Sequence, residues 1–193
     1  MIKVTVTDAN VVDAFNRLLQ MSEQPTGALA AIGEAMMEFT KQRFDLSEDP
    51  YGNPWLPNST TTVNMVLHRS GKNFKKNGEL SAQGARVAAG KKPLIGETKS
   101  LSTQFSYRVL DYQVAVSSSM IYAALQNFGG TVVPKTAKTL FFMVGDQKVF
   151  VKKVTIPARP FFPNEQQGIP DELAKSFSEI LEAAILGALN GGS

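Results

Sequence analysis

The spacing of apolar residues predicts helices near both ends of the chain. After Asp8, which suits a helix N-cap, apolar side chains recur every three or four residues until Pro25 breaks the helix. A second helix is predicted from about Thr26 to Phe44. A last helix begins near Pro170, because proline is accepted in a first helical turn. The apolar stripes of the second and last helices are Leu29, Ile32, Met36, Phe39 and Leu173, Phe177, Ile180, Leu181, Ala184.

The second helix has two interpretations. Small residues at positions 28, 31 and 35 allow a neighbouring element to approach closely, and that neighbour is either another subunit or the core of the same domain. The core interpretation is the simpler one, and both can hold together.

Between the helices, alternation of apolar and polar residues predicts strands. Ile2 to Thr7 alternates at the start, residues 105–117 form a hairpin around Asp111-Tyr112, and residues 140–154 form another around Gly145-Asp146. Short helical segments are expected at 96–105 and 121–128, the latter capped by Ser119 and stopped by Gly129-Gly130. These elements predict an α+β fold in one structural domain, residues 1–193. A small, mostly antiparallel sheet lies between N-terminal and C-terminal helices, and residues 190–193 form a frayed tail.

Two proline-rich stretches are too rigid for regular structure. Residues 47–58 hold three prolines and the only tryptophan, Trp55, between Pro54 and Leu56, with Pro57 next. An aromatic side chain on such a turn is typically fixed in the core. The second stretch, 157–163, places Arg159 between Ala158 and Pro160, where we expect it to pair with a carboxylate of its own or a neighbouring chain.

Charge is distributed unevenly along the chain, although the net charge is only +3. Residues 1–68 carry 4 basic and 8 acidic side chains, residues 69–99 carry 8 and 2, residues 100–160 carry 7 and 2, and residues 161–193 carry 1 and 5. Oppositely charged regions favour contact between copies of the chain, and the basic middle equally favours nucleic acid.

Residues 69–93 combine lysines, glycines and small residues with few large apolar groups. Because such a segment buries little surface, we expect a flexible basic loop or arm. Its basic residues, which suit phosphate contacts or an acidic face of a neighbouring subunit, are Lys72, Lys75, Lys76, Arg86, Lys91 and Lys92.

Catalytic and metal-binding patterns are missing from the sequence. There is no cysteine and only one histidine, His68, so thiol catalysis and a two-histidine metal site within one chain are excluded. The adjacent Glu48 and Asp49 are more typical of a polar turn than of a metal site, and no glycine-rich phosphate loop occurs. We expect no cofactor and no enzymatic activity. No apolar run is long enough to cross a bilayer and no signal core is present, so we expect the protein in the cytoplasm of the cell that produces it.

Four segments, in order, resemble a known family. Residues 50–57 (PYGNPWLP), 94–101 (LIGETKSL), 122–130 (YAALQNFGG) and 156–162 (IPARPFF) resemble motifs of the phage virion morphogenesis proteins, the tail-completion family of Mu-like phages. The resemblance spans roughly residues 10–185. Lys99 and Gln126 depart from its usual glycine and histidine.

The resemblance implies a structural virion protein that acts in head–tail joining or tail completion. Its implied form is an oligomeric ring at the neck, in contact with connector and tail proteins. A tail terminator or tube-capping protein is an alternative, as is a morphogenesis factor that contacts packaged DNA through the basic arm. The candidate structural or interface residues are Trp55, Pro54, Pro57, Tyr122, Phe128, Gly129, Arg159, Pro160 and Phe161.

Overall fold

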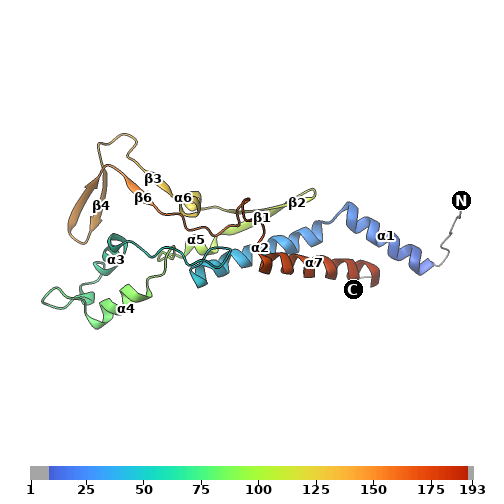
Figure 1. Cartoon of the computed structure of the whole chain (residues 1–193), viewed down its shortest axis with the longest axis horizontal. Helices are drawn as coiled ribbons and strands as arrows, with labels where there is room; N and C mark the ends of the chain where they lie inside the picture. The colour runs from blue at the N-terminus through green and yellow to red at the C-terminus, as the bar shows by residue number, and fades with distance from the viewer. Residues whose placement is uncertain (1–8, 191–193) are drawn as a thin grey trace. The chain divides into compact units, whose positions relative to one another are not determined.

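The computed structural model describes residues 9–190 (Figure 1), and this part of the chain divides into two compact units. Unit 1 contains the described residues up to 41, residues 105–119, and those from 163 onward. Unit 2 contains residues 42–104 and 120–162. Each unit therefore combines segments that are far apart in sequence. The single structural domain over residues 1–193 stays a prediction.

Long helices form most of unit 1: α1 (Ala9–Glu23), α2 (Thr26–Leu46), whose last residues belong to unit 2, and α7 (Asp171–Asn190). These bounds confirm the predicted helices, and α1 ends just before Pro25, which cannot continue it. The first predicted strand, the Asp8 cap and the last three residues of the predicted frayed tail lie outside the described residues, whereas Asn190 is the last residue of α7.

A guanidinium stabilises the pairing of α1 with α7. Arg17 Nε donates to the carbonyl oxygen of Ala188 at 2.7 Å, and Nη2 donates to that of Leu189 at 3.2 Å. The last carbonyls of a helix have no intrahelical donor and carry partial negative charge. Arg17, on α1, therefore supplies hydrogen-bond donors to two of the unpaired carbonyl groups at the C-terminal end of α7.

The first hairpin of the sequence analysis is confirmed in unit 1. β1 (Phe105–Leu110) and β2 (Gln113–Ser118) pair antiparallel around the predicted turn. Tyr107 of β1 packs on α2 at Gly33, where an added Cβ would lie 2.6 Å from Tyr107 Cδ2. This close approach is made at a glycine, and the expected close approach at the alanines of positions 28, 31 and 35 stays a prediction.

Unit 2 contains short helices and two nested strand pairs. The helices are α3 (Thr60–Leu67), the 3-10 turn η1 (Gly71–Asn73), α4 (Ala82–Gly90), α5 (Ser100–Thr103) and α6 (Ala123–Phe128). The strands are β3 (Gly130–Val132), β4 (Leu140–Val144), β5 (Gln147–Val151) and β6 (Val154–Ile156). β4 pairs with β5, and β3, which precedes them in the chain, pairs with β6, which follows them. Lys152 and Lys153 connect β5 to β6, and the alternation of apolar and polar residues is therefore interrupted there.

The predicted α+β class is confirmed, with a difference in the sheet. The strands of the described chain form three separate antiparallel pairs instead of one small sheet. The predicted helical segments at 96–105 and 121–128 are α5 and α6. The residue at the N-cap of α6 is Tyr122, not Ser119.

The expected basic arm at 69–93 is not confirmed, because this segment contains η1 and α4. Ser81 caps α4 by accepting from Gly84 N at 3.1 Å, and its own hydroxyl donates to Lys72 O at 2.7 Å. Gly84 packs on Asn73, where an added Cβ would lie 2.1 Å from the Asn73 carbonyl oxygen. Local capping and one close glycine contact thus order a segment that is poor in apolar residues.

Candidate functional site

Three buried aromatic rings from separate parts of the sequence form the centre of unit 2. Phe44, at the end of α2, lies 5.2 Å from Trp55 and 5.3 Å from Phe161, measured between ring centroids. The Phe44–Trp55 pair is edge-to-face, which is a favourable aromatic geometry. We call Phe44, Trp55 and Phe161 the tryptophan cluster.

The turn that carries Trp55 is stabilised by its acidic residues. Asp49 accepts from the backbone N–H of Tyr51 at 2.8 Å and of Asn53 at 2.9 Å, and Gly52 takes a positive φ of 83°. Glu48 pairs with the buried Arg43 at 2.8 Å. These two carboxylates thus support a polar turn, as the sequence indicated.

Hydrogen bonds join this turn to the second proline-rich stretch, about a hundred residues later. Trp55 Nε1 donates to the carbonyl of Pro160 at 2.7 Å. Arg159 Nε donates to that of Leu56 at 2.8 Å, and Nη2 to that of Pro57 at 2.9 Å. The expected carboxylate partner is therefore replaced by two carbonyls of a turn whose prolines leave few backbone donors. Burial lowers the pKa of the Arg159 guanidinium, which nevertheless stays protonated near neutral pH.

The end of α6 packs against the same stretch. The side-chain oxygen of Asn127, which is buried, accepts from Phe161 N at 2.9 Å and from Phe162 N at 3.2 Å. Gly129 follows α6 with φ 70°, and an added Cβ would lie 2.6 Å from the nitrogen of Ala158. A glycine is required here for both its conformation and its proximity to the next segment.

The structure therefore brings together the three segments that carry the nine candidate residues. Trp55, Arg159 and Phe161 are buried, Gly129 and Pro160 are half-buried, and Pro54, Pro57, Tyr122 and Phe128 are exposed. The buried and half-buried residues have contacts within unit 2. A contact role for the exposed ones stays a prediction. The sequence missed Asn127 and Phe44, because neither belongs to a pattern that points to a partner so distant in the chain.

A groove of about 980 Å³ in unit 2 adjoins this cluster. Its walls combine hydroxyl groups of α3, apolar side chains and three basic groups, and include Thr61, Met65, Leu94, Leu101, Tyr122, Phe142, Lys91, Lys153 and Arg159. Burial and the charge of Arg69 lower the pKa of Lys91, an effect that Glu97 opposes. No carboxylate lines the groove, so this lining lacks the carboxylate acid–base pair of many hydrolases.

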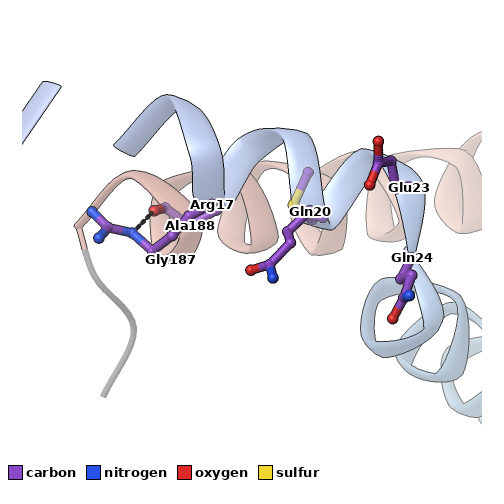
Figure 2. A pocket seen from close by; sticks show the side chains of 7 residues that line it. Arg17, Gln20, Glu23, Gln24, Gly187 and Ala188 are labelled. Atoms are coloured by element: carbon purple, nitrogen blue, oxygen red, sulfur yellow. Dashed lines mark hydrogen bonds between the residues drawn. The ribbon is translucent and has the colours of Figure 1, made fainter. Parts of the chain in front are cut away.

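A second cavity, of about 610 Å³, lies in unit 1 beside the α1–α7 pair. Figure 2 shows Arg17 directed at the end of α7, with Gln20 and Glu23 following along α1 and Gln24 just after it. Arg17 is engaged with the end of α7, and its Nη1 also pairs with Asp13. This cavity therefore lies where Arg17 caps the C-terminal end of α7.

The six basic residues of the predicted arm have different environments. Lys75 pairs with Glu79 at 3.0 Å, Lys91 donates to Ile95 O, and Lys92 donates to Asp45 O at 2.7 Å. Lys91 is half-buried, and the other five side chains are exposed, among them Lys72, Lys76 and Arg86.

His68 is the C-cap residue of α3. Its ring lies 4.7 Å from that of Phe74, and an added Cβ at Gly145, in the β4–β5 turn, would lie 2.8 Å from it. Across residues 9–190, no three acidic, histidine or cysteine side chains gather as a metal site. No helix in this range is both long and apolar enough to cross a membrane.

The first ninety-five residues contain the region that relates this chain to known proteins. The model of the phage virion morphogenesis family matches residues 6–95. Residues 6–95 are thus similar to the phage virion morphogenesis family. Comparison with curated proteins and with solved structures gives no match.

The family match confirms the resemblance and indicates a role in assembly of the phage virion. It includes the Trp55 turn and the folded segment with α3 and α4, and it ends before Arg159. The tryptophan cluster therefore joins the matched region of the virion morphogenesis family to a stretch of the chain outside it.

Proposed function

We propose that this protein acts in head–tail joining or tail completion, as a subunit of an oligomeric ring at the neck between the connector and the tail. The phage virion morphogenesis family supports the assembly role. The ring and its position are our inference from the sequence motifs and from the surface of the chain.

One observation carries the proposal of an assembled state. Eight hydrophobic residues are buried among the described residues, whereas nineteen large hydrophobic side chains are exposed. A subunit of this size that stayed monomeric would bury more of its apolar side chains and leave smaller apolar patches. Contacts with other subunits would cover this surface.

The exposed candidate residues are where we place contacts to neighbouring virion proteins. Phe128, the last residue of α6, is 75% exposed, and Tyr122, its N-cap residue, is 41% exposed. The buried residues of this helix, Ala123 and Asn127, lie between them in the sequence. Pro54 and Pro57 are exposed on either side of the buried Trp55. The tryptophan cluster holds the turn and α6 against the same stretch of chain, so a partner would meet them as a fixed surface.

Electron microscopy of lysates from a phage that lacks the gene tests the proposed position. We expect DNA-filled heads beside separate tails of normal length, and restoration of complete particles by the wild-type gene. Tails of irregular length would instead support the terminator alternative, and complete particles without the protein would refute a role in joining.

Variants connect the test to the surface. Phe128→Ser should lower the yield of joined particles. The stability of the purified protein in urea should be unchanged, because the phenyl side chain of Phe128 is already exposed to water. Leu110→Ser is a matched control, since Leu110 is 58% exposed on β1 of the other unit. If both variants lower the yield of joined particles equally, α6 is not the contact surface.

The DNA-contacting alternative has less support, because three of its six basic residues are engaged within unit 2. Triple substitution of Lys72, Lys76 and Arg86 by glutamine tests it. DNA binding that falls steeply with salt and is lost in this variant would establish the alternative.

A further inference from the structure

The outer face of the β4–β5 hairpin is apolar and exposed. Phe141 pairs with Phe150 across the strands, their ring centroids are 5.2 Å apart, and the side chains are 54% and 60% exposed. Met143 is on the same face of β4, two residues along, and is also exposed. We call Phe141, Met143 and Phe150 the hairpin patch.

The opposite face of this hairpin is already in use. Phe142 lines the groove, β4 packs against α3, and the ring of His68 fills the space beside Gly145 in the turn. These contacts fix one face of the hairpin within unit 2. Because successive side chains of a strand point to opposite faces, the hairpin patch is directed away from these contacts.

Lysines border the hairpin patch. Residues 135–153 contain five lysines and one acidic residue, Asp146, in the turn. Lys148 is directly across from Met143 in the strand register, and Lys152 follows β5. Both lysines are exposed. A partner for this surface should thus combine apolar and acidic groups.

Helix α7 has such a surface. Its buried and half-buried residues, among them Leu173, Ile180 and Ala184, define the face that packs within unit 1. A different face carries Leu181, Ile185 and Leu189, which are 45%, 42% and 41% exposed and follow one another at intervals of four residues. We call Leu181, Ile185 and Leu189 the α7 stripe.

The charge of α7 is opposite to that of the hairpin. Helix α7 contains four acidic residues and one lysine. Glu182 directly follows the first leucine of the stripe, precedes Ile185 by three residues, and is exposed. The exposed apolar residues around α6 lack this feature, because residues 121–128 carry no charged side chain. The α7 stripe thus complements the hairpin patch in both apolar character and charge.

We propose that the hairpin patch of one copy of this protein docks on the α7 stripe of a second copy. The contact is heterologous, because two different surfaces meet, and repetition of such a contact closes a ring when the rotation allows it. This inference names the contact between subunits in the proposed ring and rests on that function for its place in the virion. The pairing of the two surfaces is tested independently on the purified protein.

The chain contains no cysteine, so engineered thiols report on one contact at a time. In the test, Met143→Cys and Ile185→Cys are combined in one chain and oxidised, in the purified protein at high concentration and in assembled particles. We expect a ladder of covalent multimers that disappears on reduction. Arg86→Cys with Ile185→Cys is the matched control, because Arg86 is exposed on α4, away from the hairpin strands in sequence.

Mixing the two single-cysteine variants separates the possible arrangements. A mixture should give covalent dimers and nothing larger, since each copy then offers one thiol, and neither variant alone should form dimers above the control level. A disulfide within a single chain, or multimers no more abundant than in the control, would overturn the inference. Multimers of the purified protein, together with absence of the protein from particles, would uphold the contact and refute the neck location.

Charge exchange is the second measurement. Lys148→Glu, and separately Glu182→Lys, should each lower the yield of cross-linked multimers several-fold. Both changes in one chain should restore most of that yield. If the combined variant is as defective as the two single variants, the proposed charge complementarity is wrong.

Discussion

Replacing Asn127 by alanine removes one oxygen that accepts two backbone N–H groups. The bond to Phe161 N is 2.9 Å long and buried, and the bond to Phe162 N is 3.2 Å long and half-buried. A buried donor left without a partner costs about 1–3 kcal/mol, and the half-buried donor costs less because water can reach it. We therefore expect Asn127→Ala to lower the free energy of unfolding by about 2–4 kcal/mol.

Trp55 is the only tryptophan and is buried in the tryptophan cluster, which also contains Phe161, so its fluorescence reports on this region directly. With a urea m-value of about 2 kcal/mol/M, the expected loss lowers the midpoint by about 1–2 M. Gln126→Ala is the control: it shortens the neighbouring amide but keeps the backbone carbonyl that accepts from Arg159 N. Midpoints that fall equally in the two variants would refute the assigned role of Asn127.

Three further predictions concern glycines and a helix end. Gly129→Ala should lower the free energy of unfolding by about 2 kcal/mol or more in the same fluorescence titration, since φ is 70° and the new Cβ meets backbone. Residues 69–93 should resist trypsin in the wild type and be cut in Gly84→Ala, whose Cβ would lie 2.1 Å from a carbonyl oxygen; Gly90→Ala, with nothing within 4 Å, should remain resistant. Arg17→Ala should cost about 1 kcal/mol and speed amide hydrogen exchange at the adjoining ends of α1 and α7; unchanged exchange there would contradict the capping role.

The sequence determined the local elements of this protein. The apolar stripe and Pro25 define α1 and α2, the alternation around Asp111-Tyr112 and Gly145-Asp146 defines two hairpins, and the turn of residues 47–58 identified Trp55 as a buried residue. Each of these features depends on residues within about one or two turns of the chain, so their spacing is visible in the sequence.

The segment at 69–93 is the case in which composition did not reveal the local structure. Few large apolar residues indicated a flexible arm, whereas Ser70 and Ser81 cap η1 and α4 and Gly84 permits a tight backbone contact. The caps were visible as serines before helix-compatible residues. The contact at Gly84 was not, because a glycine has the same appearance in a loop and in a packed helix.

Only the tertiary structure decided which distant segments meet. Trp55 and Pro160, or Asn127 and Phe161, are paired by hydrogen bonds across 105 and 34 residues, and single bonds of this kind leave no periodic trace in a sequence. The same holds for exposure: the sequence shows apolar residues in α7 and in the β4–β5 hairpin, but folding decides which of them pack inside a unit. The side chains that remain exposed on these two elements form the surfaces we assign to assembly, since local spacing specifies an element and long-range packing specifies its free face.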